Sequence, residues 1–230
     1  MWLLDVFLVN LPCNTNSQKP TEMRKIIFTL LFACLVQCVA AQDCYKVTYT
    51  GARPTIKDFA QAYLSQVQVY DDPVDEVGLD EATNAFKQAW MRYRNGVKQI
   101  DGDKFIVDEQ NGYIRYESQY DNHLLCAEMC YWNEADGKHK LIAVNITSFT
   151  DGRYTLGQFD GLFFMRYNNA TKMMADCDAP GFEPRCINDN LDNISYSLPR
   201  TGKNITETAW LKNGKTSKRV LKWNGRKFSY

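Results

Sequence analysis

Hydrophobic and polar positions follow two different periods along the chain, and the change of period divides the sequence. Apolar residues recur every three or four positions in 56–67 and again in 80–94, which predicts two helices. From Lys104 onward apolar and polar residues alternate, which predicts strands. Helices followed by a run of strands are typical of an α+β domain.

The expected strands are short and are separated by tight turns. Asn111-Gly112, Asp136-Gly137 and Asp151-Gly152 favour the positive φ values of hairpin turns, and such short connections leave neighbouring strands antiparallel. We therefore expect two N-terminal helices packed on a curved antiparallel β-meander sheet of about eight strands. The main strands are expected at residues 105–109, 113–120, 124–132, 140–149, 161–167, 194–198, 205–212 and 217–223.

The beginning of the chain predicts export. Met23-Arg24-Lys25 opens a basic segment, an apolar run follows, and Ala40-Ala41 provides small residues for cleavage, so residues 23–41 are interpreted as a signal peptide. The apolar run is shorter than the roughly 20 residues that a transmembrane helix needs. Residues 1–22 are interpreted as an upstream extension from a gene model begun too early.

The mature chain is then expected to be a single α+β domain, residues 42–230, that is periplasmic or secreted. A lipoprotein is the weaker alternative. Leu31-Phe32-Ala33-Cys34 has the form of a lipid-attachment motif, but the chain remains apolar after Cys34, whereas a lipid-anchored mature end usually turns polar. The mature chain contains no further candidate transmembrane helix.

Charge is balanced overall but unevenly distributed. Removing residues 1–41 takes away three basic and two acidic residues from a neutral chain, which leaves a net charge of −1 and argues against nucleic acid as a partner. Residues 200–230 nevertheless carry nine basic residues and one acidic residue. One interpretation is solvent-facing lysines that protect sheet edges. The other is an anion-binding face for a glycan or lipid head group, with candidate binding residues Trp210, Trp223, Arg219, Lys222 and Arg226.

Five cysteines remain after residue 41, and an exported chain is expected to pair some of them. Cys177 and Cys186 flank a loop rich in proline and glycine, so we predict a disulfide between them. Cys126 and Cys130 lie in one predicted strand, about 13 Å apart, too far to pair with each other. An odd number leaves at least one cysteine without an intramolecular partner.

No catalytic residue can be assigned from the sequence. Glu117 and Glu128 lie on neighbouring predicted strands, so a hydrolase of glycan or peptide that uses paired carboxylates is an alternative function. No metal-binding residue is assigned either, although a structural calcium is the best metal hypothesis because one loop gathers oxygen ligands. These ligands are Asp176, Asp178, Asn188, Asp189, Asn190 and Asp192.

Several motifs resemble those of uncharacterised exported proteins of gut Bacteroidetes. They are the signal that ends Ala-Ala-Gln42, the strand residues 128–132, the segment Leu198-Pro199-Arg200-Thr201-Gly202-Lys203 and Trp223-Asn224-Gly225. This resemblance implies a periplasmic or surface location and carries over no functional residue. The function expected from the sequence is an exported binding or interaction module. The sequence does not identify its ligand, and a glycan or another anionic component of a cell surface is the candidate.

Overall fold

The structure is a computed structural model that describes residues 44–66, 81–97, 102–155, 161–185 and 190–230. The chain divides into two units, residues 1–42 and 43–230. Only the second unit is described below. The expected upstream extension and signal peptide lie outside the described residues and stay predictions.

Two helices form where the sequence predicts them. Helix α2 (Ile56–Gln66) begins after Thr55, whose backbone N–H donates to Asp58 Oδ2 at 2.7 Å and whose hydroxyl donates to the same oxygen at 2.9 Å. This arrangement satisfies polar groups at the helix start. Helix α3 (Glu81–Arg94) is followed by a turn at Gly96, which has a φ of 83° and donates its N–H to Tyr93 O.

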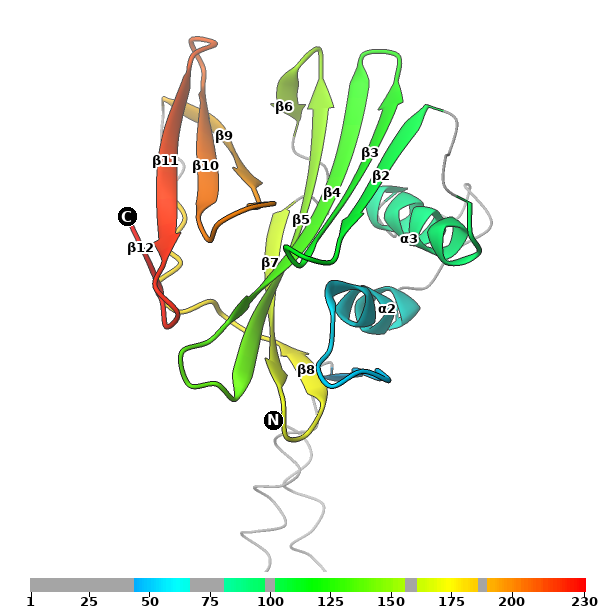
Figure 1. The fold of residues 1–230 in the computed structure, drawn as a ribbon. Helices are drawn as coiled ribbons and strands as arrows, with labels where there is room; N and C mark the ends of the chain where they lie inside the picture. The colour runs from blue at the N-terminus through cyan, green and yellow to red at the C-terminus, as the bar shows by residue number, and fades with distance from the viewer. Residues whose placement is uncertain (1–43, 67–80, 98–101, 156–160, 186–189) are drawn as a thin grey trace, which may run out of the picture. The chain divides into compact units, whose positions relative to one another are not determined.

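Eight strands form one antiparallel sheet, which we call sheet A. Their order is β1-β8-β7-β5-β4-β3-β2, with the short β6 paired to β5 beside this path, and β2 to β5 form the expected meander (Figure 1). The strands are β1 (Cys44–Lys46), β2 (Asp103–Asp108), β3 (Tyr113–Tyr120), β4 (His123–Asn133), β5 (His139–Thr150), β6 (Arg153–Thr155), β7 (Gly161–Asn168) and β8 (Met173–Asp176).

The last four strands do not join sheet A, which corrects the expectation of a single sheet. They form a separate antiparallel sheet, sheet B, in the order β12-β11-β10-β9, at the left of Figure 1. Alternation predicts that a segment is a strand but not which sheet it enters, because strands of either sheet have the same period. The strands are β9 (Leu191–Ser197), β10 (Ile205–Leu211), β11 (Thr216–Trp223) and β12 (Phe228–Ser229).

Both faces of sheet A are buried. On β4, Met129 packs in a cluster with α2 and α3, whereas its neighbour Cys130 packs in a second cluster with residues of sheet B. On β5, Ile142 and Ala143 divide in the same way. Because successive side chains of a strand point to opposite faces, the helices cover one face of sheet A and sheet B packs against the other. The broad α+β prediction is confirmed, and the domain has three layers.

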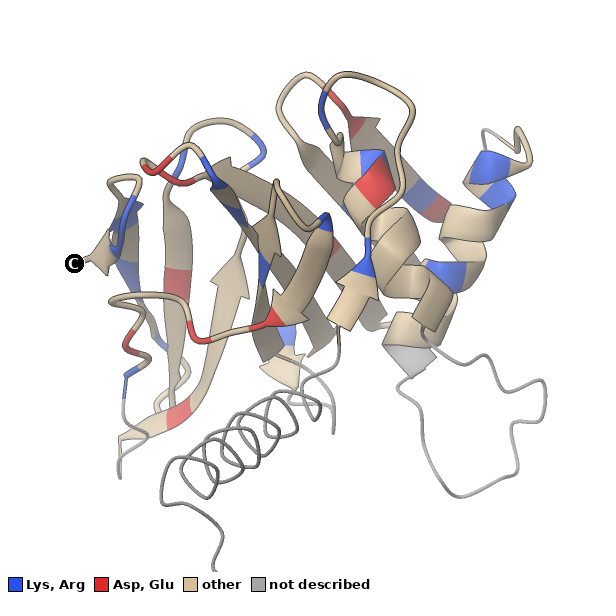
Figure 2. Cartoon of the chain, turned by 90° about the horizontal axis from the view of Figure 1, so that it is seen from below, with Lys and Arg blue, Asp and Glu red and all other residues tan. Residues whose placement is uncertain are grey.

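Basic and acidic residues are interspersed over the strands and helices rather than separated into two halves (Figure 2). Basic residues recur along α3, which carries Lys87, Arg92 and Arg94. Neither of the helices described is long and apolar enough to cross a membrane.

Gly181 and Gly202 both have a positive φ, but only Gly181 lies against sheet B, so substituting each tests the contact at Gly181. Gly181 has a φ of 70°, and a Cβ there would lie 2.4 Å from the backbone oxygen of Phe228. Gly202 has a φ of 85° and no atom within 4 Å of its Cβ position. We expect Gly202→Ala to lower the free energy of unfolding by about 1 kcal/mol through backbone strain alone. Gly181→Ala should lose a further 1 to 3 kcal/mol, roughly, because the Phe228 backbone must move. Urea denaturation measures both, and equal losses would contradict this account of the contact.

Candidate functional site

A pocket of about 460 Å³ lies on the helix-side of the turn between β4 and β5. This volume is within the range of small-molecule sites. We call it the Lys140 pocket, and it is lined by Tyr49, Ala52, Arg53, Pro54, Asn133, Glu134, Gly137, His139, Lys140 and Asn169.

Three segments that are distant in sequence build this pocket. One is the loop between β1 and α2, which ends at Pro54, and another is the β4–β5 turn. The third is the β7–β8 turn, where Asn169 donates its backbone N–H to Lys138 O at 2.9 Å and its side-chain amide to Gly137 O at 3.1 Å. These hydrogen bonds fix the two turns against each other.

Lys140 is the unusual residue of the pocket because it is a buried cation. It lies on the same face of β5 as Ile142 and Val144, which pack under the helices, and it is only 7% exposed. Its Nζ donates a hydrogen bond to Asn133 Oδ1 and lies 4.7 Å from the centre of the Tyr131 ring. An ammonium has three N–H donors, and Asn133 is its one hydrogen-bond acceptor among the described residues.

No carboxylate compensates the charge of Lys140 within the described part of the chain. Burial is the main cause that lowers the pKa of Lys140, and the nearby positive charge of Arg53 lowers it further. Arg53 also lines the pocket, is exposed, and makes no ion pair or hydrogen bond with the described residues. The pocket therefore presents two cations without a protein counter-ion.

The acidic groups beside the pocket are already neutralised. Arg166 donates to Glu134 through Nε–Oε1 at 2.7 Å and Nη2–Oε2 at 2.5 Å. His139 Nδ1 lies 2.5 Å from Asp136 Oδ2, and Arg166 lies 3.7 Å from the same oxygen. These contacts leave Lys140 and Arg53 as the uncompensated charges.

Glu134, Asp136 and His139 also come close enough to consider a metal ion, because their ligand atoms lie within 4.8 Å of one another. However, the guanidinium of Arg166 already supplies the positive charge at this cluster. A metal ion would have to displace it. We interpret the cluster as an ion-pair network and assign no metal to it.

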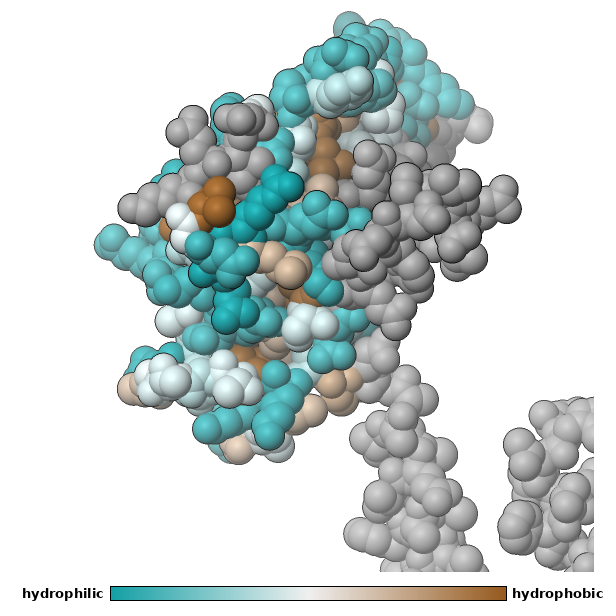
Figure 3. All heavy atoms as spheres, turned by 90° about the vertical axis from the view of Figure 1, so that its right-hand side faces the viewer, coloured by the Kyte–Doolittle hydropathy of each residue, from teal (hydrophilic) through white to brown (hydrophobic). Residues whose placement is uncertain are grey.

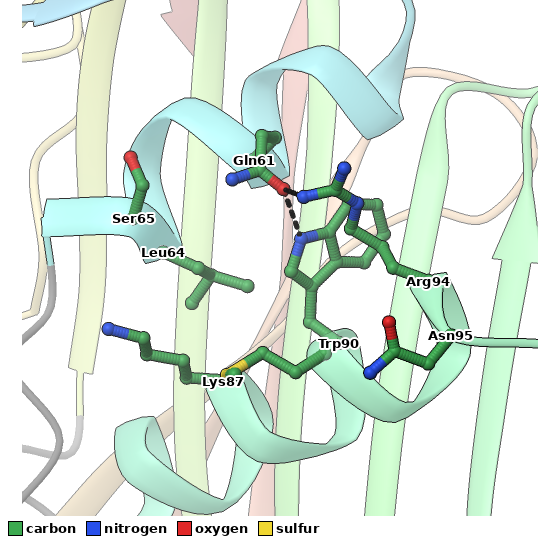
Figure 4. Close-up of a pocket in the computed structure, with 8 residues that line it drawn as sticks. Gln61, Leu64, Ser65, Lys87, Trp90, Arg94 and Asn95 are labelled. Atoms are coloured by element: carbon green, nitrogen blue, oxygen red, sulfur yellow. Dashed lines mark hydrogen bonds between the residues drawn. The ribbon is translucent and has the colours of Figure 1, made fainter. Parts of the chain in front are cut away.

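A second pocket, of about 360 Å³, lies between α2 and α3 (Figure 4). Gln61 Oε1 lies at its centre and accepts hydrogen bonds from Trp90 Nε1 at 3.1 Å and from Arg94 Nη1 at 2.5 Å. Leu64 adds apolar surface to the wall. The oxygen of Gln61 is thus satisfied by the walls of the pocket itself, which makes this pocket a weaker candidate than the Lys140 pocket.

A third pocket, of about 460 Å³, lies at the other end of sheet A, between the ends of β3, β4 and β5. Its lining includes Tyr120, His123, Leu124 and Phe149, and Tyr120 is 74% exposed.

On the face shown in Figure 3, hydrophilic side chains predominate and the hydrophobic ones form only small, separate patches. That face offers no broad apolar docking surface in the part of the chain that the structure describes.

The structure does not bring the five sequence-predicted binding residues together. Trp223 is 6% exposed and packs against Trp132 and Phe228 between the sheets, whereas Lys222 and Arg226 are exposed. Strand alternation places Lys222 and Trp223 on opposite faces of sheet B. Trp223 therefore has little surface left for stacking on a ligand.

The other two predicted residues are held by protein partners. Trp210 donates from Nε1 to Ser195 Oγ at 2.8 Å. Arg219 donates to Glu207 Oε2 at 2.6 Å, and its guanidinium lies 3.5 Å from the centre of the Tyr230 ring. Glu207 is fully buried and also lies 2.7 Å from Arg185 Nε. Arg219 thus serves a buried ion-pair network.

No disulfide joins the described cysteines Cys44, Cys126, Cys130 and Cys177 to one another. The expected partner of Cys177, Cys186, lies outside the described residues, so this disulfide stays a prediction. The calcium hypothesis has the same standing, because Asn188 and Asp189 also lie outside them. Burial raises the pKa of Cys177 to about 11, which favours the unreactive thiol.

The paired carboxylates of the hydrolase alternative do share a face, but Arg115 lies between them. Its Nε donates to Glu117 Oε1 at 2.8 Å and its Nη1 donates to Glu128 Oε1 at 2.7 Å. Partial burial is the largest single influence on Glu117 and opposes its ionisation. The hydrogen bonds and positive charges of Arg115 and Lys104 together outweigh it and lower the pKa of Glu117. A glycosidase acid instead requires a raised pKa.

Glu128 is also saturated with donors. It is 2% exposed and accepts hydrogen bonds from the Tyr113 hydroxyl at 2.6 Å, from Asn145 Nδ2 at 3.0 Å and from the Leu198 N–H at 3.0 Å. Leu198 follows β9, so this carboxylate connects the two sheets. Its role is to hold the layers together rather than to transfer a proton.

Sequence reasoning missed Lys140, although a signal for it exists. Lys140 precedes Ile142, Val144 and Ile146 at intervals of two, in the predicted strand 140–149. A lysine in phase with buried apolar residues is expected on the buried face.

We compared the chain with family models, with curated proteins and with solved structures. None of the three comparisons found a match.

The Glu128 carboxylate generates a stability prediction. Glu128→Ala leaves Arg115, Tyr113 and Asn145 without their buried acceptor, so we expect the free energy of unfolding to fall by about 3 to 5 kcal/mol. Glu128→Gln keeps one oxygen acceptor and should lose less. Glu183→Ala, at an exposed residue, should change it by less than about 0.5 kcal/mol. Urea denaturation measures all three, and a Glu128→Ala loss no larger than that of the control would contradict the bridging role.

Asp136 generates a pH prediction. The hydrogen bond from His139 and the backbone N–H of Lys138 lower the pKa of Asp136 to about 2. A lowered pKa stabilises the fold above the ordinary aspartate pKa, and this contribution disappears as the pH falls through about 2. Asp136→Asn should therefore be less stable than the parent at pH 6, and the difference should shrink between about pH 4 and pH 2. Urea denaturation over a pH series tests this, with Glu183→Gln as control, and a constant difference would refute it.

Proposed function

We propose that this chain is an exported binding module that captures an anionic ligand in the Lys140 pocket. The observation that carries the proposal is a lysine that is only 7% exposed and has no carboxylate partner among the described residues. Burying a charge without a partner costs free energy. An anionic group in the pocket would recover that cost, and Arg53 would supply a second positive charge.

The shape and lining of the pocket support a small polar ligand. Asn133 and Asn169 contribute amides and Tyr49 contributes a ring, which are the groups that bind sugar hydroxyls and sugar faces. We therefore propose an acidic sugar or another small anionic component of a cell surface. In this proposal the N-terminal helices act as scaffold, because α2 starts directly after the pocket loop at Thr55.

The hydrolase alternative gains no supporting observation. Its two carboxylates are bridged by Arg115, and Glu128 is committed to the contact between the sheets. Glu134 lines the Lys140 pocket and Asp136 lies beside it, but both carboxylates have basic partners. Binding without chemistry on a glycosidic or peptide bond is the function that these contacts favour.

Isothermal titration calorimetry with glucuronate and with inorganic phosphate tests the proposal. Lys140→Met keeps most of the unbranched side chain but removes its charge, and we expect it to weaken binding of either probe about ten- to a hundredfold. Arg53→Gln should weaken binding less, because its charge is exposed. Lys138→Met, on the neighbouring exposed lysine, should have no effect.

Two results would contradict the proposal. One is equal affinity in the parent and in Lys140→Met, with folding verified by circular dichroism. The other is the same loss in Lys138→Met, since it would mean that general surface charge attracts the probes. Binding should also weaken as salt rises, because mobile ions screen the exposed Arg53.

A further inference from the structure

We infer that the amine of Lys140 forms an imine with an aldehyde or ketone that carries an anionic group. This inference rests on the proposed function, because it requires an anionic ligand in the Lys140 pocket. In the covalent step Arg53 holds the anionic group, and the neutral form of Lys140 attacks the carbonyl carbon. It goes beyond that function because it assigns a covalent step and a chemical class of ligand to one residue. Acidic sugars in their open-chain form and oxo acids belong to this class.

The geometry of Lys140 fits an amine that reacts rather than one that only attracts. Its Nζ is positioned by the hydrogen bond to Asn133 and by the Tyr131 ring beneath it, and the residue lines the pocket. The ring is in turn held by Phe59, whose centre lies 5.3 Å away in an edge-to-face contact. A fixed amine loses little conformational entropy when it attacks a carbonyl group.

Lysine reacts as the neutral amine, so the groups around it decide how readily it does so. A carboxylate would hold the ammonium form, and Lys140 has no such partner among the described residues. Glu134, the acid that lines the same pocket, accepts hydrogen bonds from two nitrogens of the Arg166 guanidinium, Nε and Nη2. Burial and the charge of Arg53 both lower the pKa of Lys140.

The reaction balances without a further reagent. The lone pair of Nζ attacks the carbonyl carbon, the carbon–nitrogen bond forms, and an amine proton moves to the oxygen to give a carbinolamine. The nitrogen lone pair then forms the second carbon–nitrogen bond as the carbon–oxygen bond breaks, and the hydroxyl takes the remaining proton from the nitrogen and leaves as water. No oxidant or reductant takes part, and hydrolysis reverses the sequence. The pocket thus combines an amine, a cation for the anionic group and enough volume for a small ligand.

Pyridoxal phosphate, an aldehyde with a phosphate group, is a suitable probe. The mature protein is incubated with one equivalent, the imine is reduced with borohydride, and the modified residue is located by peptide mass spectrometry. We expect the adduct predominantly on Lys140. Lys140→Arg keeps the positive charge but cannot form the imine, so it should abolish this adduct. Lys138→Arg, the matched control on an exposed lysine, should leave the adduct on Lys140 unchanged.

A second comparison separates the imine from anion binding. Arg53→Gln should slow labelling by pyridoxal phosphate several-fold but leave labelling by butanal, a neutral aldehyde, unchanged. Adducts spread evenly over exposed lysines, or the same pattern in Lys140→Arg, would overturn the inference while leaving anion binding intact. Conversely, equal labelling of Lys140 by both aldehydes in parent and Arg53→Gln would support the reactive amine and remove Arg53 as the anion holder.

Discussion

Burial of sheet A on both faces is the constraint on which the rest of the structure depends. Along β4 and β5 every side chain must suit one of two interiors, since Met129 and Ile142 face the helices and Cys130 and Ala143 face sheet B. The same alternation places Lys140 on the helix-side face, in phase with Ile142. The Lys140 side chain faces the interior because side chains alternate between the two faces of a strand, and both faces of this sheet are covered.

Buried charges are treated differently in different parts of this domain. Glu128 and Glu207 lie between the layers, and each is matched by at least one arginine at hydrogen-bonding distance. Such matched charges resist separation, because removing one partner leaves the other without compensation. Lys140 is the contrast, since its nearest acceptor is the neutral amide oxygen of Asn133. The unmatched charge, and not the number of charges, identifies the candidate site.

Local features of the fold could be predicted from the sequence, whereas the pairing of distant segments could not. The helices near 56–66 and 81–94 and the Asp151-Gly152 turn, with φ values of 52° and 73°, follow from period and turn chemistry. Sheet B was missed because alternation does not say which strands pair. The continuous apolar run of β5, Leu141 to Val144, did contain a signal, because such a run requires cover on both faces. The Lys140 pocket could not be predicted, since its three segments meet only in the folded chain.

The pocket also lies at a weak edge of the sheet. Strand β1 has three residues and pairs only with β8, and its continuation adds one hydrogen bond, from Val47 N to Lys172 O at 2.9 Å. A ligand that contacts both Arg53, after this short edge strand, and Lys140, on β5 within the sheet, would connect the edge of sheet A to its interior. A free ligand concentration of about a hundred times the dissociation constant would raise the free energy of unfolding by about 2.7 kcal/mol. Binding of such a ligand would therefore raise the melting temperature of the domain.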